Sequence, residues 1–119
     1  MEIKPHKIGD IEIAEIISED IVIGNVEEAL ELLGNLYYQG FDNIIVHEKN
    51  ITTAFFDLKN KMAGEILQKF SNYRVRLLIV GDASKFTSES LKAFIYESNR
   101  GRHVNLVSSI DEAISKIRA

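Results

Sequence analysis

The chain contains no cysteine, and Pro5 is the only proline among its 119 residues. The missing cysteines exclude a disulfide framework, a thiolate nucleophile and a cysteine-ligated zinc or iron–sulfur site. No apolar run approaches the roughly 20 residues that a membrane-spanning helix needs. The first six residues, MEIKPH, lack the long apolar core and the small-residue cleavage site of a secretory signal. We therefore expect a cytoplasmic protein without a membrane contact.

Basic residues are also few. The chain has 14 Lys and Arg against 18 Asp and Glu, a formal net charge of -4 and a pI of about 5.4. General nucleic-acid binding requires a surplus of Lys and Arg facing the phosphates, so we expect no nucleic-acid partner. The hydrophobic share of 45% and the charged share of 27% are typical of a globular protein. The length and the absence of a linker composition predict a single domain over residues 1–119.

Strand patterns alternate with helix patterns along the chain. Gly9-Asp10 is a turn signal between two strand patterns, which predicts a hairpin. Pairs such as Asn25 and Glu28 are typical of a helix start, and Gly40 is typical of a helix end. The predicted strands are residues 2–6, 11–17 with a short extended continuation at 21–24, 43–47, 75–80 and 103–107. The predicted helices run from the Asn25 cap to Gly40, from about Ala54 to Ser71, from a Thr87 or Ser88 cap to about Asn99, and from the Ser109 cap through Ile117.

The resulting order is β-β-α-β-α-β-α-β-α. Strands that alternate with helices are joined by crossovers, and right-handed crossovers produce a mostly parallel sheet covered by helices. The hairpin adds one antiparallel strand at the edge. The sequence therefore predicts a single-domain α/β fold with a mostly parallel sheet and one antiparallel edge strand.

This order, from Ile11 to Ile117, resembles the STAS domain of bacterial anti-sigma-factor antagonists and of sulfate transporters. The similarity is densest at residues 55–60 (FFDLKN), which correspond to the family's F-x-D-S-S-G-hydrophobic stretch. Asp57 matches, whereas Leu58 and Lys59 occupy the positions of the two serines. The resemblance implies a regulatory module that works through protein contact. It does not imply phosphorylation here, because no hydroxyl stands at those positions.

At closer range the chain resembles a family of small prokaryotic proteins catalogued as domain of unknown function 4180. That family brings no assigned activity. The matching segments are residues 47–50 (HEKN), 56–58 (FDL), 63–73 (AGEILQKFSNY) and 94–99 (FIYESN).

Polar residues follow the predicted parallel strands. In open parallel sheets, ligands bind beyond the carboxyl ends of the strands. The side chains of His47, Glu48, Asp57 and Asp82 are candidates to converge there as a ligand-binding cluster, with the histidine as a base or a ligand. The alternative is that polar residues end strands simply because strands end at water. We expect no metal site, because His6, His47 and His103 lie on different elements.

Basic residues fall at the starts of the last two predicted strands. If these strands are neighbours, Arg74, Arg76, Arg100 and Arg102, with His103, form one basic rim at the amino edge of the sheet. Such a rim can bind an anion or an acidic partner, or it can be solvated charge with carboxylate neighbours. No phosphate-binding glycine motif is present, so no cofactor and no catalytic residue are predicted.

Two further features point to contact with other chains. Adjacent aromatic pairs, Tyr37-Tyr38 and Phe55-Phe56, cannot both face inward from a helix, and exposed aromatics are typical of interfaces. Gly64 lies inside a predicted helix, where a close backbone contact with the sheet or with a second subunit would explain it. We therefore expect a non-enzymatic module that contacts a protein partner and can form a homodimer. The alternative is a small-molecule-binding protein or small enzyme at the carboxyl edge.

Overall fold

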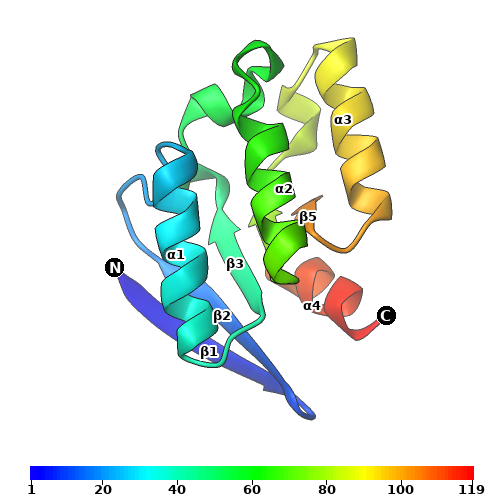
Figure 1. The fold of residues 1–119 in the computed structure, drawn as a ribbon. Coiled ribbons are helices and arrows are strands. Elements are labelled where there is room, and N and C mark those ends of the chain that lie inside the picture. Colours follow the sequence, from blue (N-terminus) through cyan, green and yellow to red (C-terminus); the bar gives the residue numbers. More distant parts are fainter.

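The computed structural model describes residues 1–119 as one five-stranded sheet with four α-helices (Figure 1). The strands are β1 (Glu2–Ile8), β2 (Ile11–Ile17), β3 (Asn43–His47), β4 (Arg76–Val80) and β5 (Val104–Val107). The helices are α1 (Val26–Tyr38), α2 (Met62–Tyr73), α3 (Glu89–Arg100) and α4 (Ile110–Arg118). The β1–β2 pair is antiparallel and every other pair is parallel, which confirms the predicted fold class. No helix is long and apolar enough to cross a membrane.

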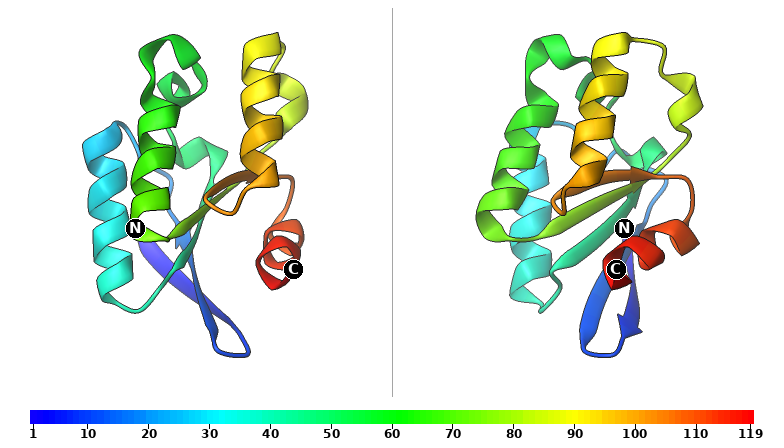
Figure 2. Two further views of the ribbon diagram at one scale, coloured as in Figure 1. Left: turned by 45° about the vertical axis from the view of Figure 1, so that its right-hand side comes forward. Right: turned by 90° about the vertical axis from the view of Figure 1, so that its right-hand side faces the viewer.

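The strands lie in the order β1-β2-β3-β4-β5, the same as their order in the chain. Each right-handed crossover therefore adds its helix to the same face of the sheet. Figures 1 and 2 show this result, with α1, α2 and α3 on one face and α4 alone on the other. The larger core of 18 buried residues lies under the three helices, and the smaller core of 6 lies under α4. The α4 face is thus the less covered face of the sheet.

Local signals set most helix ends as the sequence predicts. The Asn25 side chain accepts a hydrogen bond from the Glu28 backbone N–H, and Ser109 does the same for Glu112. The Glu28 carboxylate reaches back one residue further than a capping box requires, to the backbone N–H of Gly24. Gly40 has a φ of 97°, a left-handed conformation that favours glycine after a helix.

The helix predicted from about Ala54 to Ser71 is wrong in its first half. Residues 53–56 and 58–60 form separate 3-10 turns, and α2 begins only at Met62. Lys61 has a φ of 64°, which an α-helix cannot contain. Asp57 and Asn60 each accept a hydrogen bond from a backbone N–H two residues onward. These short polar side chains divide into separate turns a segment that the apolar pattern alone predicts as one helix.

The expected contact of Gly64 with the sheet is also wrong. A Cβ atom added at Gly64 would meet no other atom within 4 Å. The same holds for Gly34 in α1. Both helical glycines face open space, so neither is required by packing inside the chain.

Candidate functional site

Two imidazoles flank one buried carboxylate on the α4 face of the sheet. His6 Nε2 lies 2.9 Å from Glu15 Oε1, and His47 Nε2 lies 2.9 Å from Glu15 Oε2. The Glu15 side chain is 8% exposed, whereas His6 is 21% and His47 is 30% exposed. Each carboxylate oxygen therefore accepts one imidazole N–H, and both histidines are more exposed than the carboxylate that they contact.

The strand register brings these three residues together. In the hairpin, Lys4 lies opposite Glu15 and His6 lies opposite Ile13, so His6 and Glu15 are diagonal neighbours. In the parallel pair, Glu15 lies opposite Ile45, two residues before His47. Side chains alternate between faces along a strand, so all three point to the same side. Sequence reasoning missed this cluster, although the two-residue turn at Gly9-Asp10 was sufficient to place His6 beside Glu15.

The pKa of Glu15 reflects both its burial and its partners. Burial alone would raise the pKa of this carboxyl, but the hydrogen bonds from His47 and His6, together with their charge, outweigh it and hold the pKa below its ordinary value. Glu15 is therefore ionised near neutral pH. No group of three or more His, Cys, Asp or Glu side chains is arranged to hold a metal ion.

His47 also lines a groove at the carboxyl edge of the sheet, hereafter the edge groove, with a volume of about 750 Å³. Its walls come from three segments: the loop before α1, the residues after β3 and the residues after β4. The lining residues are Ile21, Gly24, His47, Glu48, Lys49, Ile51, Thr52, Thr53, Val80, Gly81 and Lys85. A second, smaller hollow of about 130 Å³ is lined by Ile17, Ser18, His47 and Lys49.

Asn50 holds two of these walls together. Its amide nitrogen donates to the carbonyl oxygens of Ser18 and Asp20 at 2.8 and 2.9 Å, and its amide oxygen accepts from the His47 N–H at 3.2 Å. The side chain is fully buried. Its backbone carbonyl accepts from Val22, and the adjacent Ile51 forms a parallel bridge with Ile23. The predicted extended segment at 21–24 therefore runs beside residues 50–52.

The four residues predicted at this edge have separate roles. His47 and Glu48 line the edge groove. The Glu48 carboxylate pairs with Lys85 and accepts from the Asp82 backbone N–H. The Asp82 carboxylate turns away to cap the next turn through Ser84. Those contacts with Ser84, and the charge of Lys85, hold the pKa of Asp82 below its ordinary value despite some opposition from desolvation. Asp57 caps the turn at 58–60 and does not line the groove.

The groove does not arise from a reversal of strand order. In doubly wound sheets the ligand crevice opens where successive crossovers switch direction. Here the order never reverses. The long connection from β3 to α2, residues 48–61, instead bends over the carboxyl edge in three 3-10 turns and builds the groove from loop residues.

The arginines of the predicted basic rim lie in two separate places. β4 and β5 are neighbours, and Arg74, Arg76 and Arg102 line a common hollow at the amino edge of the sheet. Arg100 lies apart from them: it pairs with Glu97 at 3.8 Å and sits 6.0 Å above the Tyr96 ring.

Comparison with known proteins gave one match. A family model described as Domain of unknown function (DUF4180) matches residues 8–117. No curated protein and no solved structure matches the chain.

Proposed function

The chain belongs to the Domain of unknown function (DUF4180) family, as its sequence segments predicted, and we propose that it is a cytoplasmic binding module for a small polar molecule. One observation carries this proposal: His47, oriented by a buried carboxylate, stands in the wall of the edge groove. Because the contact with Glu15 fixes the orientation of the His47 ring, the unbonded edge of the ring faces one direction, as a specific binding site requires.

The other polar groups of the groove support binding rather than a reaction. Glu48 is occupied by Lys85 and by a backbone N–H, so it is not a free base. The Thr52 hydroxyl oxygen accepts from the Ala54 N–H and caps a turn. Two lysines also line the groove, Lys49 paired with Glu19 and Lys85 paired with Glu48, and each ammonium keeps further N–H donors for a ligand. A ligand with several hydrogen-bonding oxygens fits this lining.

A bulky side chain in the groove will abolish this binding. Thr53 is exposed and lines the groove, so Thr53→Trp fills it without disturbing the core. We expect a low-molecular-weight extract of the source cells to shift the amide NMR signals of Gly24, Lys49 and Gly81 in the wild type and to leave them unmoved in the variant. Native mass spectrometry of freshly purified protein will identify a retained ligand.

Thr87→Trp is the matched control, because Thr87 is equally exposed but does not line the groove. It should keep the wild-type response. Shifts that persist in Thr53→Trp, or that fall outside the groove, would contradict the proposal, as would a wild type that shows no response and carries no ligand.

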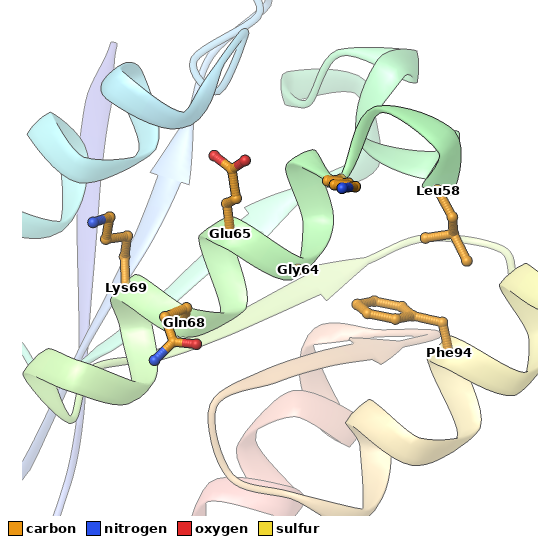
Figure 3. A pocket seen from close by; sticks show the side chains of 7 residues that line it. Leu58, Gly64, Glu65, Gln68, Lys69 and Phe94 are labelled. Carbon is orange, nitrogen blue, oxygen red and sulfur yellow. The ribbon is translucent and has the colours of Figure 1, made fainter.

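A second candidate is the regulatory protein-interaction module implied by the STAS resemblance, and a groove between α2 and α3 favours it. This helix groove has a volume of about 600 Å³ and is lined by Leu58, Lys61, Gly64, Glu65, Gln68, Lys69 and Phe94. Figure 3 shows the side chains of Leu58 and Phe94 together at one end of this groove, and a Cβ added at Gly64 would meet nothing within 4 Å. Glycine lets the backbone of another helix approach closely.

The charges of the helix groove fit a second copy of the chain. Glu65 has Lys61 four residues before it and Lys69 four residues after it, so the three lie along one side of the helix. This alternation of sign allows each Glu65 to pair with a lysine of the other copy where two such helices cross near Gly64. The exposed Tyr37, Tyr38 and Tyr96 add apolar surface elsewhere on the helical face.

Gly64→Leu will separate stability from self-association. Leucine has a higher helix propensity than glycine and meets open space, so the free energy of unfolding should rise by about 1 kcal/mol. The side chain blocks the crossing, so light scattering should show a monomer. Gly34→Leu, in equally open space on α1, should give the same gain and keep the dimer. A wild type that is monomeric at its highest soluble concentration would contradict this candidate.

A further inference from the structure

The arginine hollow lies at the edge of the sheet opposite the edge groove and has a volume of about 240 Å³. Arg74 comes from the residues after α2, Arg76 from the start of β4 and Arg102 from the residues before β5. Ile11 and Ile117 contribute apolar surface to the same hollow. Three arginines from two segments of the chain thus line one hollow beside a small apolar patch.

These three cations lack a side-chain carboxylate partner. None of them lies within 4.0 Å of an Asp or Glu oxygen. Arg76 is only 8% exposed, and its contacts are neutral: Nε donates to Asn105 Oδ1 at 2.7 Å and Nη1 donates to the Lys116 carbonyl at 3.2 Å. Arg102 donates to the Ala119 carbonyl oxygen at 3.2 Å.

The side chains of the arginine hollow carry more positive than negative charge. Burial, and secondarily the charge of Arg102, lower the pKa of the Arg76 guanidinium. A buried cation without a counter-ion is costly, and a like charge beside it adds to the cost. Asp42 also lines the hollow, but its carboxylate accepts from Asn43 and pairs with no arginine. The three guanidiniums of the hollow thus outnumber its one side-chain carboxylate.

We propose that the arginine hollow binds the dianionic phosphate of a small phosphate monoester. A phosphate dianion supplies negative charge, which the side chains of the hollow lack. Guanidinium groups donate pairs of parallel hydrogen bonds to phosphate oxygens, which makes arginine the preferred partner for this group. Ile11 and Ile117 can contact the organic part of the ester. This site is separate from the edge groove and does not depend on the function proposed for that groove.

The test is a titration of ¹⁵N-labelled protein at low ionic strength with glycerol 3-phosphate, inorganic phosphate and a phosphoserine peptide. We expect saturable shifts at the amides of Asn43, Arg76 and Arg102, with glycerol 3-phosphate binding more tightly than inorganic phosphate. Tighter binding of the phosphoserine peptide would support the same phosphate site and would indicate that the phosphate group belongs to a partner protein. Shifts confined to the edge groove would overturn the proposal.

Substitutions decide whether the arginines are responsible. Arg74→Gln and Arg102→Gln remove exposed side chains, and each should weaken binding about tenfold or more, because each loses charge-assisted hydrogen bonds. Arg100→Gln removes the same charge from a nearby exposed arginine outside the hollow and should change affinity by about twofold at most. Equal losses in all three variants would show a diffuse charge effect and would refute a site. No binding by the wild type would refute it equally.

Discussion

Replacing Asn50 with alanine will lower the free energy of unfolding by about 3 kcal/mol and the Tm by about 10 °C. The side chain is fully buried and makes three hydrogen bonds, to His47 and to the carbonyls of Ser18 and Asp20. Alanine leaves these backbone groups without their partner in a site closed to water, which costs more than the hydrogen bonds themselves contribute. Urea unfolding followed by circular dichroism measures the loss.

Two further variants identify the cause. Asn50→Asp keeps an oxygen to accept from the His47 N–H but replaces the amide donor with an acceptor that faces two carbonyls, so it should destabilise the fold at least as much as alanine. Asn35→Ala, on the exposed side of α1, should change stability by about 0.5 kcal/mol at most. If Asn50→Ala were as stable as Asn35→Ala, the buried amide would not be what joins the walls of the edge groove.

The fold was predictable because its signals are local. The period-two apolar pattern at 11–17, the β-branched run at 43–47 and the caps at Asn25 and Ser109 each act within a few residues, and each appears in the structure where the sequence predicts it. The exception is the stretch from Thr53 to Lys61. There the helical spacing of apolar residues continues through Asp57 and Asn60, whose side chains compete for backbone N–H groups and break the helix into turns.

The candidate site was less predictable, because it depends on which strands are neighbours. Glu15 and His47 are 32 residues apart, and only the pairing of β2 with β3 brings them together. The amino-acid sequence of neither segment specifies that these two strands are neighbours. The convergence of Arg76 and Arg102 was predictable on one condition, that β4 and β5 are adjacent, and the structure meets it.

Carboxylates were the hardest residues to assign from the sequence. Asp57 and Asp82 stand near strand or turn ends, as a site residue would, but both serve as caps for the turn that follows them. Glu15 lies within a strand, where alternation places it on the same face as Ile13, and it is the carboxylate that the fold buries. Burial, not position at a strand end, distinguishes the residue that orients His47.

Glu15→Gln will lower the free energy of unfolding by about 2 kcal/mol at pH 7, because two hydrogen bonds to a charged, buried group are replaced by weaker ones. A glutamine offers one acceptor oxygen, so only one of His6 and His47 can keep its N–H partner. Glu12→Gln is the matched control: Glu12 is on the same strand, its side chain is 41% exposed, and it pairs with Lys7 at 3.7 Å. It should change stability by about 0.5 kcal/mol at most.

The difference between wild type and Glu15→Gln should disappear in acid. The native pKa of Glu15 is lowered from 4.5, so the unfolded chain binds a proton more readily than the native protein does. The extra stability is therefore complete above pH 4.5 and is lost as the pH falls through the native pKa. Urea unfolding at pH 7, 5, 4 and 3 should show the two curves converging at the low end, while the Glu12→Gln curve follows the wild type throughout. A gap that stays constant with pH would mean that Glu15 stabilises the sheet by packing alone, and His47 would then lack the charged partner on which its role in the edge groove depends.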